Sequence, residues 1–137
     1  MPRQKRSRLI LNPPTIKGMS AVGGPKRNPE KINLFFEEYQ AIKLLDYEGM
    51  TQEEAAVYMQ VSRPTVTRIY ETARQKVAKA LNEGKDLIVK GGKFHFSESR
   101  YCCLSCKANF DLQDGADKKC PVCNSSEITS LNEYYSG

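Results

Sequence analysis

The stretch TQEEAAVYMQVSRPTVTRIYET, residues 51–72, decides the fold. Thr51 and Glu54 form a capping box, in which each side chain satisfies an unpaired amide of the first helical turn, and the helix that they start runs to about Met59. Ser62, another residue favoured at the N-cap, follows after a connection too short for anything but a tight turn. Two helices joined in this way predict a helix-turn-helix.

The residues on either side of this turn predict two further features of the helical domain. A first helix is expected before Thr51, because Phe36, Ala41 and Leu44 fall near one of its faces and Gly49 can end it. The helix that starts at Ser62 is the third and longest, and a glycine follows its last turn. Its apolar stripe consists of Val66, Ile69, Ala73, Val77, Ala80 and Leu81.

Two short strands are expected after the third helix, at residues 87–89 and 94–96, around a turn that contains Gly91 and Gly92. A lone hairpin is marginal in water, so we expect it to dock on the helices. The fold class expected for residues 32–96 is therefore mainly α, a three-helix helix-turn-helix domain with a short β-hairpin. The single histidine, His95, is expected to be an ordinary strand residue rather than a metal ligand.

The leading turn of the third helix has a composition that suits contact with DNA. In a helix-turn-helix, the N-terminal end of the second helix of the pair enters the major groove. Arg63 and Arg68 can donate to guanine or grip phosphate, and Ser62 with nearby amides can hold a phosphate. A plain three-helix bundle with a solvated charged face has the same apolar stripe and is the alternative. The candidate DNA-binding residues on this helix are Ser62, Arg63, Pro64, Thr65, Thr67, Arg68 and Thr72.

The net charge of +5 is concentrated at the N-terminus. Residues 1–31 hold eight basic residues against one acidic residue (8 − 1 = +7), residues 32–96 hold nine of each, and residues 97–137 hold four against six (4 − 6 = −2). Prolines and glycines break any regular period in residues 1–31, so we expect a basic irregular arm there. Such an arm binds nucleic acid by releasing counterions, although many basic tails only aid solubility. It adds the candidate DNA-binding residues Arg3, Lys5, Arg6 and Arg8.

Residues 97–137 contain all five cysteines, and four of these form two C-x2-C motifs separated by thirteen residues. The ligands expected from these motifs are Cys103, Cys106, Cys120 and Cys123. Cytosolic thiols stay reduced, so the motifs predict one tetrahedral four-thiolate metal site rather than disulfides. We therefore expect residues 97–137 to form a small zinc-ribbon-like β module.

Two alternatives at the metal site stay open from the sequence alone. Cys102 can replace Cys103 as a ligand, although the spacing of Cys103 matches that of the other motif. Four sulfur ligands leave no open coordination position and fit a structural zinc, but the same motifs resemble those of rubredoxin, so iron is the rival metal.

Several stretches of the chain resemble one known family. They are MPR at residues 1–3, NPP at 12–14, FEEYQAIKLLDYEG at 36–49, TQEEAA at 51–56 and VSRPTVTRI at 61–69. With the glycines of the linker after the third helix, the similarity to the prokaryotic uncharacterised protein family 0251 covers roughly residues 1–95. Members of that family are predicted to bind DNA through a helix-turn-helix similar to region 4 of sigma factors. The resemblance implies a groove-reading role for Arg63, Pro64, Thr65, Thr67 and Arg68.

Together these patterns predict sequence-selective binding of double-stranded DNA, as by a transcriptional regulator, with a structural zinc in the C-terminal module. The chain has no run of about 18 apolar residues and no secretory signal, so we expect a cytoplasmic protein that does not bind membranes. One histidine and no evident pair of nucleophile and base argue against an enzyme.

Other partners and functions are also consistent with the sequence. The C-terminal module can contact the transcription machinery or another protein, and helix-turn-helix proteins commonly form homodimers. The first alternative function is a metal or redox module, which senses oxidants or transfers electrons through iron or through Cys102. The second is a protein-recruitment adaptor whose helices never touch DNA.

Overall fold

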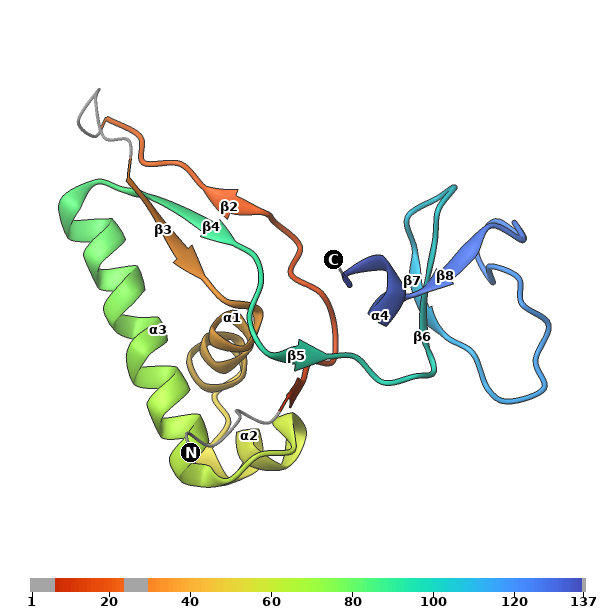
Figure 1. Cartoon of the computed structure of the whole chain (residues 1–137), viewed down its shortest axis with the longest axis horizontal. Helices are drawn as coiled ribbons and strands as arrows, with labels where there is room; N and C mark the ends of the chain where they lie inside the picture. The colour runs from red at the N-terminus through yellow and green to blue at the C-terminus, as the bar shows by residue number, and fades with distance from the viewer. Residues whose placement is uncertain (1–6, 24–29, 137) are drawn as a thin grey trace, which may run out of the picture. The chain divides into compact units, whose positions relative to one another are not determined.

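The computed structural model describes residues 7–23 and 30–136, and the chain divides into two units, residues 1–94 and 95–137 (Figure 1). Among the described residues, eight short strands in three sheets accompany four α-helices and one π-helical segment. The prediction of a mainly α, three-helix domain is therefore wrong, and the fold is mixed. Most of the strands have only two or three residues, too few for an alternating pattern to show in the sequence.

The helices of the first unit pack around one apolar cluster. Helix α1 (Phe36–Ile42) continues into the π-helical segment η1 (Lys43–Tyr47), and α2 (Gln52–Met59) and α3 (Arg63–Glu83) follow. Among the described residues, no helix is long and apolar enough to cross a membrane. The buried cluster consists of Ala41, Leu44, Ala55, Ala56, Met59, Val66 and Ile69.

The turn between α2 and α3 has the capping geometry expected from the sequence. The Glu54 amide donates to Thr51 Oγ1 at 3.2 Å, and the Thr65 amide donates to Ser62 Oγ at 3.4 Å. Gln60 ends α2 in the left-handed region, with φ 56°. A side chain there costs about 1 kcal/mol relative to glycine, so the turn is fixed in spite of an unfavourable residue.

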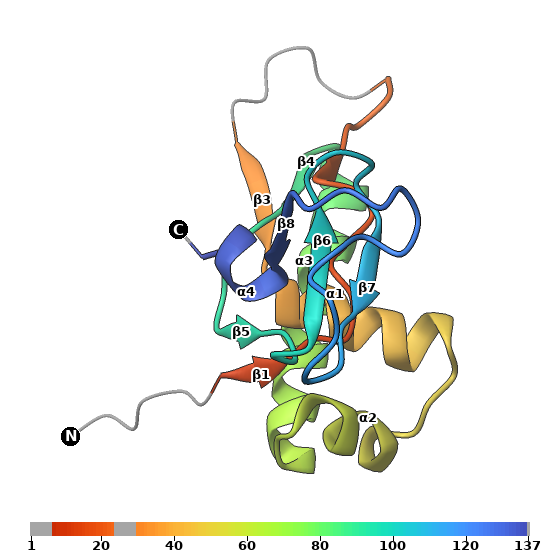
Figure 2. The ribbon, with the colours of Figure 1, turned by 90° about the vertical axis from the view of Figure 1, so that its right-hand side faces the viewer.

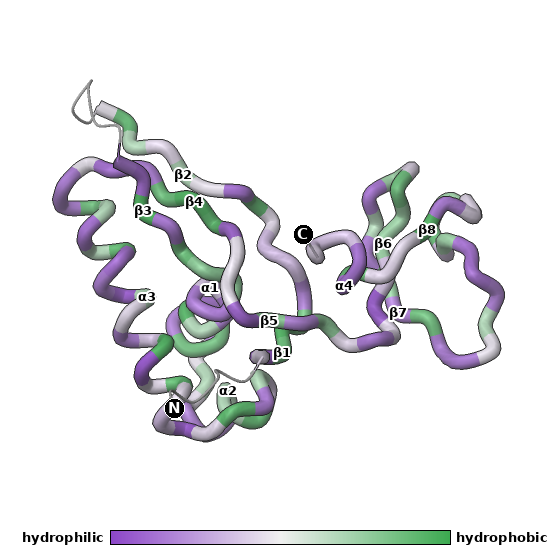
Figure 3. The backbone as a smooth tube through the Cα atoms, in the orientation of Figure 1, coloured by the Kyte–Doolittle hydropathy of each residue, from purple (hydrophilic) through white to green (hydrophobic). Residues whose placement is uncertain are grey.

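Residues after α3 do not form the predicted hairpin. Strand β4 (Asp86–Val89) runs parallel to β3 (Lys31–Leu34) and antiparallel to β2 (Gly18–Met19), and it stands out as hydrophobic in Figure 3. Strand β5 (Phe94–His95) pairs instead with β1 (Arg8–Leu9). The hairpin fails because the chain between β4 and β5 crosses the start of α1, where the Phe36 amide donates to Gly91 O at 3.0 Å.

Close packing at Gly92 shows why this crossing needs glycine. A Cβ on Gly92, whose φ is 108°, would overlap the Glu37 carboxylate at the start of α1. Strands β1 and β2 and the first residue of β3, Lys31, also lie within residues 1–31, so the prediction that this segment is irregular is wrong at those five residues. Their pairing partners are more than 50 residues away in the chain, beyond the reach of a local pattern.

The second unit contains a three-stranded antiparallel sheet (Figure 2). Its central strand is β6 (Arg100–Cys103), flanked by β7 (Asn109–Asp111) and β8 (Ile128–Ser130), and a short helix α4 (Leu131–Tyr134) follows. The buried cluster on one face contains Phe110 and two cysteine side chains. Phe96 and Leu131 are also buried in this unit.

Candidate metal centre and nucleic-acid interface

Four thiols converge at one end of the β6–β7 sheet. They come from two turns: Cys103 ends β6 and Cys106 follows it, while Cys120 and Cys123 belong to the loop before β8. All four Sγ atoms lie within 4.8 Å of one another. Cys103 Sγ lies 3.5 Å from Cys123 Sγ, and Cys106 Sγ lies 3.6 Å from Cys120 Sγ. The structure thus brings together the four cysteines that the sequence predicts as ligands.

The two turns have the same backbone geometry. The residue after each C-x2-C motif is left-handed, with φ 67° at Lys107 and 64° at Asn124. The Lys107 amide donates to Cys103 O at 3.0 Å, and the Asn124 amide donates to Cys120 O at 2.9 Å. Sequence reasoning missed these two residues, although their place directly after each motif is a local signal. Two equivalent turns present their thiols to a common point.

The donor set fits one tetrahedral metal ion. With metal–sulfur bonds of about 2.3 Å, the edges of a tetrahedron of sulfurs are about 3.8 Å, close to the separations seen here. Backbone amides also aim at the sulfurs: Cys106 N donates to Cys103 Sγ at 3.4 Å, and Val122 N donates to Cys120 Sγ at 3.4 Å. Such donors stabilise thiolates, the form in which a cysteine side chain binds a metal.

The thiols perturb one another's protonation. The Cys106 amide, followed by other donors, lowers the pKa of Cys103 to about 6. At Cys123 the Ser125 amide acts to lower the pKa, but the neighbouring thiols and burial outweigh it and raise the pKa to about 12. Four thiols this close cannot all ionise without a compensating charge. A bound divalent cation would supply that charge.

Cys102 lies outside the metal centre. It alternates with Cys103 along β6, so its side chain points to the other face of the sheet, and burial raises the pKa of its thiol. The structure therefore favours Cys103 over Cys102 as the ligand. His95 lies in β5 and is outside the cluster of candidate ligands.

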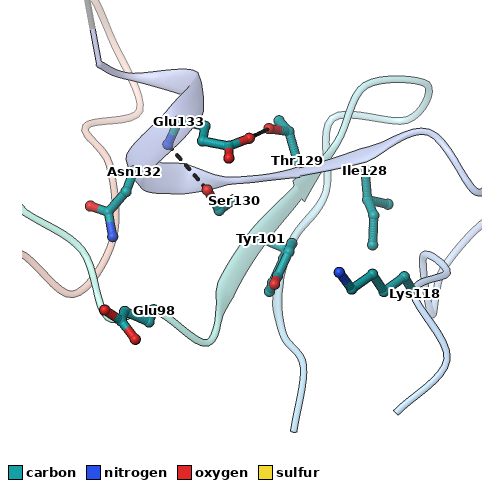
Figure 4. A pocket seen from close by; sticks show the side chains of 8 residues that line it. All are labelled: Glu98, Tyr101, Lys118, Ile128, Thr129, Ser130, Asn132 and Glu133. Carbon is teal, nitrogen blue, oxygen red and sulfur yellow. Dashed lines mark hydrogen bonds between the residues drawn. The ribbon is translucent and has the colours of Figure 1, made fainter. Parts of the chain in front are cut away.

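A polar hollow of about 440 Å³ lies beside β6 and β8 in the second unit (Figure 4). Tyr101 and Lys118 line it, together with residues of α4. Glu133 accepts from Thr129 Oγ1 at 3.2 Å, and its amide donates to Ser130 Oγ at 3.1 Å. These bonds cap α4 and hold it against the sheet. The residues that line the hollow do not include the four cysteines.

The leading end of α3 exposes most of the predicted DNA-binding residues. Ser62, Arg63, Pro64, Arg68 and Thr72 are exposed, and Thr65 is half-buried. Arg63 Nη1 lies 3.2 Å from the carboxylate of Glu53 in α2. Arg68 Nη2 donates to Thr65 Oγ1 at 3.4 Å, which aligns its side chain with the leading turn. The structure therefore gathers these side chains on one accessible surface.

Two of the predicted DNA-binding residues, Thr67 and Arg8, contact other parts of the first unit instead of lying on the exposed surface of α3. Thr67 is half-buried and donates to Gln52 of α2, so it helps to join the two helices. Arg8 is only 7% exposed, and its guanidinium lies 4.0 Å from Glu37, so it is a core residue and not a phosphate contact. It was predicted to belong to an irregular arm, and its pairing in β1 explains the difference. Arg3, Lys5 and Arg6 lie outside the described residues.

Sequence reasoning missed a third exposed arginine of α3, beyond Arg63 and Arg68. Arg74 is exposed, lies over the Tyr70 ring at 5.3 Å, and has its Nε 3.9 Å from Asp46 Oδ2. The hydrogen bond from Tyr70 to Asp46 raises the pKa of the tyrosine. The four-residue spacing of Tyr70 and Arg74 on a helix was the available signal.

Comparison with known proteins places the chain in a family. Residues 1–97 match the family described as "Protein of unknown function DUF134", and the chain belongs to this family. Its relatives bear the name UPF0251 protein, in agreement with the resemblance found in the sequence. No solved structure matches the chain.

The sequence similarity to these relatives extends over both units of the chain. The UPF0251 protein of Chloroherpeton thalassium is 34% identical over 138 residues, covering 100% of this chain and 91% of the relative. That of Caldicellulosiruptor bescii is 41% identical over 128 residues, covering 93% of this chain and 87% of the relative. That of Methanothermobacter thermautotrophicus is 38% identical over 132 residues, covering 96% and 69% respectively. Similarity is therefore not confined to the helical unit.

Proposed function

We propose that the protein binds double-stranded DNA sequence-selectively through the leading end of α3 and acts as a transcriptional regulator. The observation that carries the proposal is the exposure of Arg63 and Arg68 at the start of a helix that α2 supports across a three-residue turn. A helix held in this way can enter the major groove, where an arginine donates two hydrogen bonds to a guanine.

The ion pair at this surface does not block such contacts. The side chains of Arg63 and Glu53 are 61% and 64% exposed, and pairs as exposed as this contribute about 0–1 kcal/mol. A phosphate can therefore replace Glu53 as the partner of Arg63 at little cost. The Ser62 hydroxyl and the first amides of α3 offer a second anchor for phosphate at the helix N-terminus.

The basic arm supports the same proposal. Strand β1 lies against α2, so the chain enters the described structure beside the helix-turn-helix. Arg3, Lys5 and Arg6 precede this point by only a few residues. They are close enough along the chain to add phosphate contacts near α2, and such contacts raise affinity without reading sequence.

We infer that the four thiolates hold a structural zinc. A bound zinc would supply charge compensation and a cross-link between the two turns, with no open position for a reacting group. Cys103, Cys106, Cys120 and Cys123 would be the ligands. Metal analysis of the purified protein tests this inference: one colourless zinc per chain supports it, and a red protein with an iron–thiolate absorption band contradicts it and favours the rubredoxin-like alternative.

We propose that the chain is a cytoplasmic binding protein rather than an enzyme. The metal module, with its acidic balance, would contact the transcription machinery or another protein rather than DNA. Selection of bound fragments from the source genome would identify the target sequence. Failure to enrich any sequence would leave only non-specific binding and contradict the selective role.

Substitution of Arg68 tests whether the leading end of α3 contacts DNA bases. Arg68→Ala should weaken binding to the selected duplex by about 1–3 kcal/mol and relax selectivity, because it removes a bidentate contact to a base. Lys79→Ala is the matched control, since Lys79 is also an exposed cation of α3 but lies three turns further along. Fluorescence anisotropy at two salt concentrations measures both variants. Equal losses in the two variants would show that α3 supplies only general charge.

A further inference from the structure

Two of the four candidate metal ligands are open to solvent. Cys106 and Cys123 are exposed, whereas Cys103 and Cys120 are buried. We call these four residues the four-cysteine site. Each of its two C-x2-C turns therefore has a protected first cysteine and an accessible second one. Val122, next to Cys123, is itself 73% exposed, so a small oxidant can reach a sulfur of the site from solution.

The close sulfur contacts within the four-cysteine site join one turn to the other. Cys103 Sγ lies 3.5 Å from Cys123 Sγ, and Cys106 Sγ lies 3.6 Å from Cys120 Sγ. Each of these pairs contains one exposed and one buried sulfur. Cys102 belongs to neither pair, because it alternates with Cys103 along β6 and points to the other face of the sheet. An exposed sulfur that is oxidised therefore has a partner within reach in the opposite turn.

Pairing between the two turns is favoured over pairing within each turn. A disulfide stabilises a fold by restricting the unfolded chain, and the effect increases with the length of the loop that the bond closes. Thirteen residues separate Cys106 from Cys120 and nineteen separate Cys103 from Cys123, whereas a bond within either motif would close over only two. Bonds between the turns would also keep the turns tied together, as a shared metal ion does.

We propose that the four-cysteine site responds to hydrogen peroxide by forming two disulfides, Cys103–Cys123 and Cys106–Cys120, and that it gives up its metal as they form. This inference rests on the structural zinc of the proposed function. A cysteine binds a metal as its thiolate, and a sulfur in a disulfide no longer carries the negative charge. Formation of the two bonds therefore removes all four ligands, and the cross-link between the turns passes from the metal to the chain itself.

The chemistry of each pair balances with one molecule of hydrogen peroxide. The exposed thiolate attacks one peroxide oxygen, the O–O bond breaks, and the sulfur becomes a sulfenic acid while the other oxygen leaves as hydroxide. The buried thiolate then attacks the sulfenic sulfur, so that the S–S bond forms and the S–O bond breaks with loss of a second hydroxide. Two protons from solvent convert both hydroxides to water. Each pair thus gives two electrons to one peroxide.

Peroxide treatment of the purified full chain tests the proposal. Zinc released to a coloured chelator should increase as peroxide is added and should reach the whole zinc content at two peroxides per chain. The thiols that remain are then alkylated, and the disulfides are mapped by mass spectrometry of peptides. The map should show Cys103 joined to Cys123 and Cys106 joined to Cys120, with the alkyl group on Cys102. Dithiothreitol with added zinc should restore the bound metal.

Cys102→Ala is the matched control, because it removes the one cysteine outside the four-cysteine site, and it should give the same zinc release and the same two disulfides. Zinc that stays bound after peroxide, a disulfide within either motif or to Cys102, or sulfinic acids in place of disulfides would each overturn the proposal. Zinc content is measured before peroxide is added, and a chain without zinc at that point contradicts the structural zinc. The disulfide map tests the pairing in either case.

Discussion

The α2–α3 turn and the two cysteine turns share a left-handed backbone residue but pack against different buried clusters. Each contains a non-glycine residue in the left-handed region: Gln60 in the first unit, and Lys107 and Asn124 in the second. Seven buried apolar residues stand beneath the α2–α3 turn, whereas two of the three residues in the buried cluster of the second unit are cysteines. Because candidate metal ligands make up most of that cluster, we expect the second unit to depend on a bound metal more than the first unit does.

Of the changes considered, removing the metal should have the largest effect on stability, and it should affect the second unit only. Cys120→Ser should unfold residues 95–137 and leave the helices of residues 36–83 folded, because structural zinc contributes about 10–16 kcal/mol to small domains of this kind. Two-dimensional NMR of the labelled full chain would show loss of dispersed signals from the second unit only. Cys102→Ala is the control, since Cys102 is outside the cluster of ligands, and it should retain the metal.

A smaller side chain in the helical core should destabilise the first unit and leave the metal content of the second unchanged. Met59 is fully buried in the core of the first unit, and Met59→Ala should lower the free energy of unfolding of that unit by about 2–5 kcal/mol. Urea denaturation followed by circular dichroism measures the loss, and metal content should stay at the wild-type level. Loss of metal in this variant would mean that the two units do not fold independently.

Acidification should release the metal before it unfolds the helices. Ligation needs thiolates, and the pKa values of Cys106 and Cys123 are raised, so these thiols carry protons in the metal-free site and lose them on binding. Affinity is therefore greatest at high pH and falls as pH decreases, by about 1.4 kcal/mol per pH unit for each proton released. Competition with a coloured chelator between pH 8 and pH 5 measures the trend. An affinity independent of pH would exclude this set of ligands.

The smallest expected change in stability comes from a substitution in the α2–α3 turn. Gln60→Gly should stabilise the first unit by up to about 1 kcal/mol, because glycine adopts the left-handed conformation without strain. The melting temperature of the helical signal should rise accordingly. A decrease would show that the Gln60 side chain contributes more to the turn than its backbone costs.

Features set by neighbouring residues could be predicted from the sequence, whereas features set by distant pairing could not. The N-caps at Thr51 and Ser62 and the two C-x2-C motifs are local, and the structure confirms the helix start at each cap and the convergence of the four thiols. Burial of Arg8 depends on Glu37, which lies on another element. Likewise, the parallel pairing of β3 with β4 joins segments more than 50 residues apart.

We propose that the surface at the start of α3 lies against paired nucleotides. NMR titration of the labelled full chain with a duplex selected from the source genome tests this claim most directly. We predict that the largest shifts occur at the amides of residues 62–68, and that they diminish as salt increases. Shifts confined to residues 95–137, or none at the start of α3 when the duplex is saturating, would contradict it.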